Sequence, residues 1–336
     1  MGKAFAVLLL LGSCAEASEV GTPVSFQGRS AEEAFQAQPF SVKDAAGLRI
    51  GPSSHIGEPF DTVLFQGDDL APGTIFEVSR KEASGDWSPW VFARLKRFEG
   101  GRFWARAEFK KASAGSLRVR ISVGGGPVEV SPTVYSFEVF LRSEALEEGR
   151  GSSLGAPYQV LVGTPPAVLA REAWRAKPPK EDYSPHVPQR LTQHHTAGRW
   201  TDSVESSVKE LAVIQDFHQN GRGWNDIGYH FLIDGAGRIF QGRPVDAVGA
   251  HVRDHNTGNI GVSLLGSYHP PRNDTLSPAQ RGSLAALGSW LKDAYGVEPR
   301  TYMGHRDYNH STECPGDGVY SQLDSIRDSF SPPLQP

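Results

Sequence analysis

The sequence predicts a small all-β domain followed by an α/β domain, in which helices flank a central mixed sheet. Three observations support this order. Short apolar runs separated by turn residues fill positions 58–142, a charged and then Gly/Ser-rich linker occupies 143–165, and strand-like runs alternate with helical patterns across 166–336. A chain of 336 residues is long enough for about two domains of roughly 150 residues each.

Composition excludes several classes of protein. The chain has 34 Lys and Arg against 38 Asp and Glu, which gives a net charge of −4. This near balance predicts no global attraction to nucleic acid or to an anionic membrane. No apolar run reaches the roughly 18 residues needed to span a bilayer. The two cysteines, Cys14 and Cys314, are too few for a disulfide-stapled scaffold.

The first 14 residues read as an export signal. Lys3 precedes an apolar run, and the segment ends in Leu11-Gly12-Ser13-Cys14, which resembles a bacterial lipobox. The alternatives are an ordinary secretory signal cleaved near Ala15–Ser18, which would remove Cys14, and a buried N-terminal helix. We expect an exported protein, periplasmic or on the cell surface, whose membrane contact is a lipid anchor on Cys14. Without lipidation it would be secreted. Residues 15–57 lack sustained periodicity and are expected to form a tether.

The predicted all-β domain consists of short strands with turns between them. Residues 103–110 alternate apolar and polar, the period of a half-buried strand. Several such runs at this spacing are typical of a small β-sandwich. Trp87, Trp90 and Trp104 could form a carbohydrate-stacking platform or pack in the sheets. The predicted strands are 60–65, 75–79, 90–95, 103–109, 117–123 and 134–141.

The α/β domain contains helix and strand signals in turn. A helical pattern runs from about 202 to 219, and strands 229–233 and 238–241 flank an Asp-Gly-Ala-Gly hairpin signal. An apolar run at 260–265 predicts a buried strand. The next helix begins after Ser277, with Pro278 at its first position and Gln280 at its third, and stops at Gly296.

Three separate fragments carry residues suited to binding a metal. They contain His194, His305 and Cys314, so two imidazoles and one thiolate come from loops or strand ends. Zinc accepts these donors tetrahedrally, and three protein ligands leave its fourth position open to water. Each residue also has a structural interpretation, since buried cysteines pack in cores and adjacent histidines are often structural. Spacing alone does not decide between the two.

The second domain resembles the peptidoglycan-recognition and type-2 N-acetylmuramoyl-L-alanine amidase family, which includes an amidase-type phage lysozyme. The resemblance runs from about 171 to 330 through REAWRAKPP, QHHTAG, DFHQNGRGWNDIGYHFLID, GAGRIFQGRP, VGAHVRDHNTGNIGVSLLGSY and GHRDYNHSTECPG. It implies an amidase domain with one zinc ion per chain, held by His194, His305 and Cys314. It also implies a catalytic Tyr229, whose phenol can stabilise the oxyanion.

The role of Thr312 is undecided at the level of sequence, and the chain departs from the family pattern in two places. Thr312 stands where many family amidases carry threonine, and its hydroxyl could orient water or the oxyanion, or cap the loop. The separation of His305 from Cys314 is one residue longer than the family pattern, so His310 could approach the metal. The segment before His194 is unusually polar and predicts an exposed sheet edge.

The resemblance also suggests what the groove binds. Peptidoglycan is the implied partner, and His251 and Asn256 would contact its sugar or stem peptide. Gly223-Trp224 and Arg243 would favour meso-diaminopimelate stems, since guanidinium pairs well with the additional carboxylate. Packing for Trp224 and a surface charge for Arg243 are the alternatives. We expect a monomer that does not bind nucleic acid.

The favoured function is zinc-dependent hydrolysis of the amide bond between N-acetylmuramic acid and L-alanine. The first alternative is a non-catalytic peptidoglycan sensor with the same fold. A zinc peptidase that cuts the stem peptide is a second alternative, disfavoured because the chain has no His-Glu-x-x-His segment.

Overall fold

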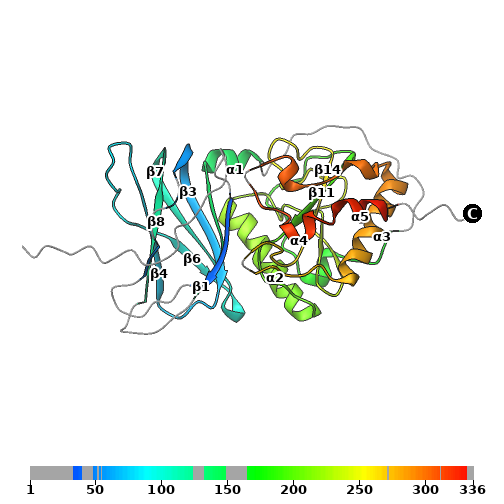
Figure 1. The fold of residues 1–336 in the computed structure, drawn as a ribbon, viewed down its shortest axis with the longest axis horizontal. Coiled ribbons are helices and arrows are strands. Elements are labelled where there is room, and N and C mark those ends of the chain that lie inside the picture. The colour runs from blue at the N-terminus through cyan, green and yellow to red at the C-terminus, as the bar shows by residue number, and fades with distance from the viewer. Residues whose placement is uncertain are drawn as a thin grey trace, which may run out of the picture.

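The chain forms two parts that lie side by side, an all-β part drawn in blue to cyan and an α/β part drawn in green to red (Figure 1). The computed structural model describes residues 33–39, 48–50, 53, 55–123, 132–148, 165–270, 272–310 and 312–330. The fold class predicted from the sequence is confirmed. The expected export signal with Cys14 lies outside the described residues.

The first part is a sandwich of two antiparallel sheets with strand orders β1-β9-β3-β7-β6 and β2-β8-β4-β5. Aromatic side chains join the sheets. Phe76 of β4 lies between Phe65 of β3 and Phe103 of β7, with ring centroids 5.0 and 5.2 Å apart. The strands are β1 (Glu33–Pro39), β2 (Leu48–Ile50), β3 (Ile56–Asp68), β4 (Thr74–Arg80), β5 (Val91–Phe92), β6 (Arg94–Arg97), β7 (Phe103–Gly115), β8 (Leu117–Val123) and β9 (Thr133–Phe140).

Three ordered elements, β1, β2 and α1, occupy positions expected for the tether and the linker. The prediction of a tether over 15–57 was wrong for β1 and β2, which pair with β9 and β8 as edge strands. Edge pairing uses backbone groups and needs no side-chain periodicity, so the sequence carries little signal for it. Helix α1 (Arg142–Glu148) occupies the start of the expected linker. Residues 149–164 lie outside the described residues.

The three tryptophans of the first part do not form a common platform. The guanidinium carbon of Arg118 lies 4.4 and 4.7 Å from the ring centroids of Trp87 and Trp90. Trp104 is buried and donates from Nε1 to Asp216 of the second part at 3.0 Å. Packing, rather than carbohydrate stacking, is therefore the role that the structure supports.

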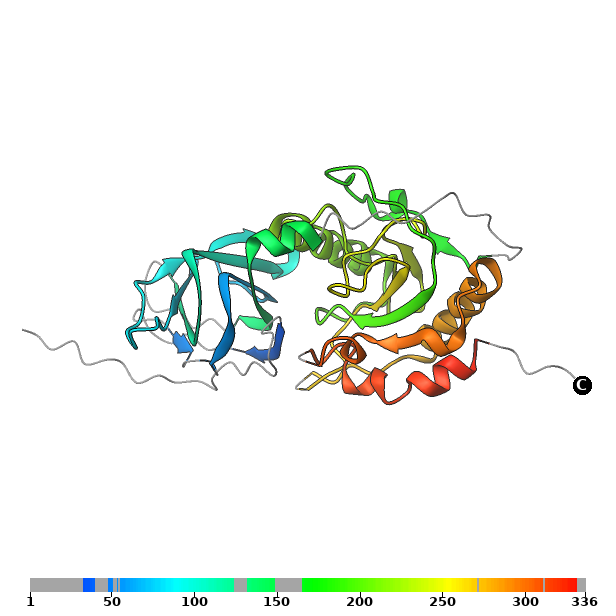
Figure 2. The same ribbon diagram turned by 90° about the horizontal axis from the view of Figure 1, so that it is seen from above.

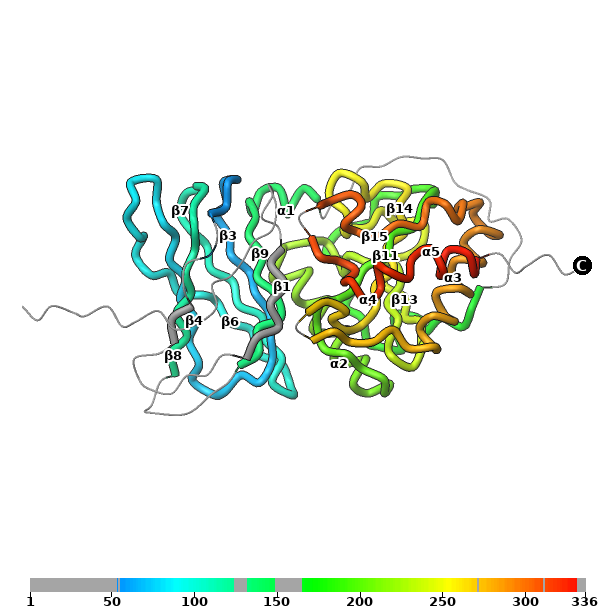
Figure 3. The backbone as a smooth tube through the Cα atoms, in the orientation of Figure 1, coloured from blue at the N-terminus to red at the C-terminus, as the bar shows by residue number. Residues whose placement is uncertain are grey.

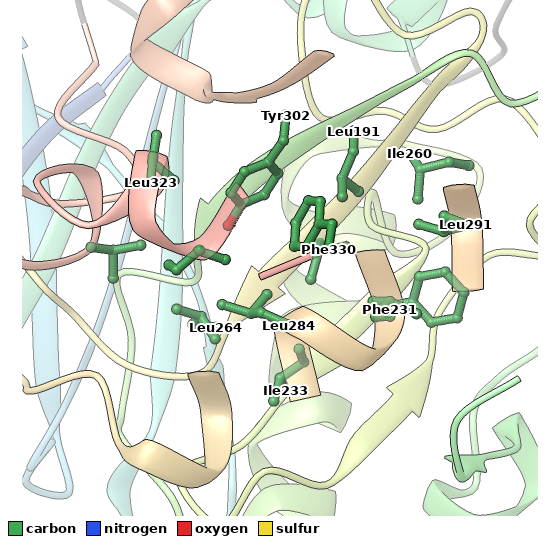
Figure 4. Packing of buried hydrophobic residues seen from close by; sticks show 14 of the residues in the cluster. Leu191, Phe231, Ile233, Ile260, Leu264, Leu284, Leu291, Tyr302, Leu323 and Phe330 are labelled. Carbon is green, nitrogen blue, oxygen red and sulfur yellow. The ribbon is translucent and has the colours of Figure 1, made fainter. Parts of the chain in front are cut away.

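The second part contains one six-stranded mixed sheet, ordered β10-β13-β12-β14-β11-β15. Side chains of β12 alternate between two cores. Phe231 and Ile233 pack with Leu284 of α3, and Leu232 packs with Leu211 of α2 on the other face. Figure 4 shows the first core. The strands are β10 (Val168–Leu169), β11 (Arg190–His195), β12 (Phe231–Ile233), β13 (Ile239–Gln241), β14 (Asn259–Leu264) and β15 (Tyr302–Gly304).

The helices of the second part begin and end where local chemistry permits. In α3 (Pro278–Tyr295), the Ser277 side chain accepts from the Gln280 amide, and Gly296 takes the left-handed conformation at φ 70°. In α2 (Val204–Asp216), Ser203 is the N-cap. A π-helical segment, η3 (Phe217–Arg222), continues α2. The shorter helical segments are η2 (Arg171–Trp174), η4 (Pro299–Thr301), η5 (His305–Asp307), α4 (Asp317–Tyr320) and α5 (Leu323–Asp328).

Strand β11 is buried, which corrects the expectation of an exposed edge before His194. It lies between β14 and β15 and is parallel to both. Its polar side chains have partners in the interior. Thr192 donates to Asn259 at 2.8 Å, and Gln193 accepts from the Tyr302 hydroxyl at 2.7 Å. A polar strand can therefore be central when hydrogen bonds satisfy its side chains.

The two parts meet through buried polar contacts along α2 and η3. Arg102 of the first part makes two hydrogen bonds to the carboxylate of Glu210, at 2.8 and 2.9 Å, and both side chains are only 2% exposed. Arg106 donates to the carbonyls of Asn220 and Gly221. Figures 2 and 3 show α1, β9 and the α2–η3 region at the junction. The junction fixes the segment that leads to Trp224.

Within the part of the chain that the structure describes, no helix combines the length and apolar character required to cross a bilayer.

Candidate metal centre

The three predicted metal ligands meet at the carboxyl ends of two adjacent parallel strands. His194 is near the end of β11, and His305 directly follows β15. Because Gln193 pairs with Gly304, both histidines leave the sheet at the same edge. The loop after η5 brings Cys314 to them. One donor atom from each of His194, His305 and Cys314 lies within 4.8 Å of the other two.

The donor set fits zinc in both chemistry and spacing. In a tetrahedral zinc site, the bonds are about 2.05 Å to nitrogen and 2.3 Å to sulfur, so the ligand nitrogen and the ligand sulfur lie about 3.5 Å apart. Nδ1 of His194 lies 3.5 Å from Sγ of Cys314. His194 and Cys314 are buried, and the imidazole centroids of His194 and His305 are 4.7 Å apart. The residues present can therefore hold a tetrahedral ion without a large rearrangement.

A chain of hydrogen bonds sets the tautomer of His194. The Asn259 carbonyl only accepts, so Nε2 of His251, at 3.0 Å, carries the proton. Burial lowers the pKa of His251 to about 3, so its ring is neutral and its Nδ1 accepts. His194 must then donate from Nε2 to this atom, also at 3.0 Å. This leaves a lone pair on Nδ1 of His194, the atom that faces Cys314.

Backbone groups hold Cys314 in place. The His195 amide approaches Sγ of Cys314 at 3.4 Å, a contact that favours the thiolate. The Cys314 amide donates to the Thr312 hydroxyl at 3.2 Å. Thr312 therefore caps the loop, which is one of the two roles predicted for it. His310 is exposed and is not part of the ligand cluster.

Two of the predicted metal ligands, His305 and Cys314, line a pocket that also includes Tyr229. The rings of Tyr229 and His194 have centroids 5.2 Å apart. Burial lowers the pKa of His194 and of His218, another residue in this region, well below the ordinary histidine value. Neutral imidazoles are the form that binds metals.

The predicted substrate residues divide into two groups. Trp224 and His251 line the pocket, and Gly223 takes the left-handed conformation beside Trp224, at φ 92°. Asn256 instead uses its side-chain oxygen to accept from the amides of His251 and Val252, so it supports the loop.

The expectation that Arg243 faces the groove was wrong. Its side chain is 1% exposed, donates to the carbonyls of Ile227 and Val248, and does not line the pocket. Burial lowers its pKa to about 10. Arg243 is therefore an interior residue, with two backbone carbonyls accepting from its side chain and the charge of Asp226 stabilising the guanidinium.

Several pocket residues were missed from the sequence. Gln66, Glu138 and Glu148 come from the first part or from α1, and Arg222 and Arg253 come from the second. Arg222, two residues before Trp224, could have been found from its position. No sequence signal identifies Gln66 or Glu138, because their place in the pocket depends on how the two parts dock.

Comparison with known proteins places these residues within a family. The N-acetylmuramoyl-L-alanine amidase family (Amidase_2) matches residues 184–317. Peptidoglycan-recognition protein SC2 of Drosophila simulans is 37% identical over 134 residues, which cover 39% of this chain and 69% of that protein. Peptidoglycan-recognition protein LB of Drosophila melanogaster is 31% identical over 163 residues, which cover 47% of this chain and 68% of that protein.

Two similar solved structures each match just under half of this chain. Drosophila peptidoglycan-recognition protein LB, at 31% identity, matches 47% of this chain and 93% of its own, with a TM-score of 0.42. N-acetylmuramoyl-L-alanine amidase LysC of Clostridium intestinale, at 27% identity, matches 48% of this chain and 98% of its own, with a TM-score of 0.41.

Proposed function

Because this chain belongs to the family of peptidoglycan-recognition proteins and type-2 N-acetylmuramoyl-L-alanine amidases, we propose that it is a zinc-dependent amidase. Its reaction would hydrolyse the amide bond between N-acetylmuramic acid and L-alanine in peptidoglycan. The observation that carries the proposal is the complete donor set of His194, His305 and Cys314, two of which, His305 and Cys314, line a pocket.

The side chains divide the work of the reaction. When bound, zinc supplies a Lewis acid that polarises the amide carbonyl and activates water. Tyr229 lies beside His194 on the pocket wall, where its hydroxyl can donate to the carbonyl oxygen as negative charge develops. His251 holds the imidazole of His194 in the tautomer that ligation requires. Thr312 positions the backbone of Cys314.

Three further expectations accompany this function. Peptidoglycan is the proposed partner, with Trp224 and His251 as contacts from the pocket wall. Export rests on residues 1–14, and lipid attachment on Cys14. We also propose that the protein acts as a monomer, since one chain supplies all three donors.

The test is digestion of purified diaminopimelate-type peptidoglycan by the zinc-loaded protein, with and without chelator. Newly formed L-alanine amino termini are counted by end-group labelling. Release should require zinc and should be lost in Cys314→Ser. His310→Gln, an exposed histidine on the same loop, should retain both zinc and activity. Zinc-loaded protein that binds peptidoglycan but releases no L-alanine termini would instead be a non-catalytic sensor.

A further inference from the structure

One wall of the pocket that contains Tyr229 is held from behind by the first part of the chain. We call residues 216–224 the wall segment, which begins at the last residue of α2 and includes η3. The side chains of this segment that line the pocket are Phe217, His218, Arg222 and Trp224. Strand β7 of the first part contacts η3. The segment therefore lies between β7 and the pocket.

The end of η3 takes hydrogen bonds from the first part. The last carbonyls of a helix have no donor within the helix, so they need donors from elsewhere. Arg106 of β7 supplies one, because its Nη1 lies 2.7 Å from the carbonyl oxygen of Asn220 and 3.0 Å from that of Gly221. Its positive charge also suits the negative end of the helix dipole. Arg106 thus acts as a cap for the π-helical segment.

The start of the wall segment is held by further contacts with the first part. Trp104 is buried and donates from Nε1 to Oδ1 of Asp216 at 3.0 Å. The ring of Phe217 packs in one cluster with Leu64 and Trp104. Gly221 also lies against Leu64, since a Cβ at this position would be 3.3 Å from both methyl carbons. The first part therefore contacts the segment near both of its ends.

On its other side, the wall segment supports Tyr229. The ring of His218 stacks on that of Trp224 at 4.8 Å and contacts the ring of Tyr229 edge to face at 5.5 Å. Nδ1 of His218 also accepts from the Gly228 amide at 3.2 Å, which holds the backbone beside Tyr229. Tyr229 in turn lies 5.2 Å from the ring of His194. Displacement of His218 would therefore move the Tyr229 hydroxyl relative to the metal ligands.

We propose that Trp104 and Arg106 are positioning residues for the reaction, and that they act through the wall segment and Tyr229. The appended all-β part thus sets the geometry of the site without contributing a reacting group. The inference rests on the proposed function, in which Tyr229 stabilises the oxyanion. A displacement of about 1 Å at a reacting group can slow catalysis about 100-fold, so contacts distant from the substrate can matter.

The kinetic test is a double-mutant cycle on the zinc-loaded full chain. Arg106→Met keeps an apolar stem but removes the donor to both carbonyls. It should lower kcat for L-alanine release about tenfold, with zinc content unchanged. In the Tyr229→Phe background it should lower kcat less than about twofold, because the hydroxyl that it positions is already absent. An unchanged kcat in Arg106→Met, or equal losses in both backgrounds, would overturn the proposal.

Two variants separate positioning from a general weakening of the junction. Arg106→Lys should recover most of the rate, since an ammonium can donate to both carbonyls. Arg199→Met is the matched control, because Arg199 crosses the same junction to Asp68 and to the Gly100 carbonyl, at 2.9 and 3.1 Å, rather than to the wall segment. It should keep the wild-type kcat. A loss in Arg199→Met equal to that in Arg106→Met would overturn the proposal.

Trp104→Phe examines the same inference at the start of the wall segment. It removes only the donor to Asp216 and keeps an aromatic ring against Phe217. It should also lower kcat, and the loss should again shrink in the Tyr229→Phe background. Thermal melting confirms that each variant is folded. If Arg106→Met does not fold, the cycle with Trp104→Phe decides, and equal losses in its two backgrounds would overturn the proposal.

Hydrogen exchange distinguishes failure of this inference from failure of the proposed function, because it needs no substrate. In Arg106→Met, the amides of residues 217–224 should exchange about fivefold faster, the scale of one lost hydrogen bond, and those of α3 should keep their rates. Unchanged rates in the wall segment would overturn the proposal. A wild-type protein that binds zinc but releases no L-alanine would refute the amidase, and the exchange rates would still decide whether Arg106 holds the segment.

Discussion

Replacing His251 with phenylalanine should weaken zinc binding although His251 is not a ligand. The substitution keeps a ring of similar size but removes the nitrogen that accepts from Nε2 of His194 at 3.0 Å. His194 then has a buried N–H without an acceptor, unless it moves the proton to Nδ1, the atom that faces Cys314. Either outcome penalises the tautomer that binds the metal.

The size of this effect follows from the buried N–H. A buried donor without a partner costs roughly 1–3 kcal/mol. At about 1.4 kcal/mol for each factor of ten, the zinc Kd should rise between about 5- and 150-fold. Loss of an outer-shell partner typically weakens metal affinity by about 10- to 100-fold, within this range.

Zinc affinity is measured by competition with a chelating dye on the purified full chain. His186→Phe is the matched control. His186 is also buried and stacks on His230, but it bonds to the Val245 carbonyl and the Gly258 amide rather than to a ligand. An unchanged zinc Kd in His251→Phe, or an equal rise in both variants, would refute the reasoning.

Three other outcomes can be checked. Arg102→Met should cost about 3–5 kcal/mol in urea unfolding, because it leaves the Glu210 carboxylate buried without its cation, whereas Arg300→Met at an exposed pair should cost almost nothing. Tyr229→Phe should lower kcat about 10²- to 10³-fold with zinc content unchanged, and an unchanged kcat would exclude its role on the oxyanion. Burial lowers the pKa of His186 below 6.5, so the folded protein binds fewer protons than the unfolded chain and the metal-free protein loses stability as pH falls below 6.5. His186→Gln should reduce that loss by up to about 1.4 kcal/mol per pH unit, and an unchanged slope in urea unfolding contradicts this.

Local chemistry made some elements predictable. The helix over 278–295 was predicted because Ser277, Pro278, Gln280 and Gly296 each act within one turn of its ends. The strand over 103–110 was predicted from alternation as half-buried. That expectation was wrong for the start of β7, where residues on both faces are buried because Trp104 and Arg106 pack against the second part. In β8, buried residues do alternate with less buried ones. The metal set required the resemblance, since His194 and Cys314 are brought together only by the fold.

Properties set by distant contacts were not predictable. Arg243 looks like a surface cation in the sequence, but neighbouring carbonyls allow it to be buried. The polar strand before His194 is central because Asn259 and Tyr302 satisfy its side chains. Glu138 enters the pocket through docking of the two parts, which no local pattern encodes.

The wide separation of the proposed zinc ligands along the chain has a consequence for the lifetime of the protein. His194 and Cys314 are more than one hundred positions apart, so the unfolded chain has no preformed site and zinc binds mainly to the folded state. By mass action, zinc then shifts the folding equilibrium as well as supplying chemistry. When zinc is scarce, more molecules will unfold and become accessible to proteases. If the proposed function is correct, zinc supply would thus control the abundance of the protein in addition to the activity of each molecule.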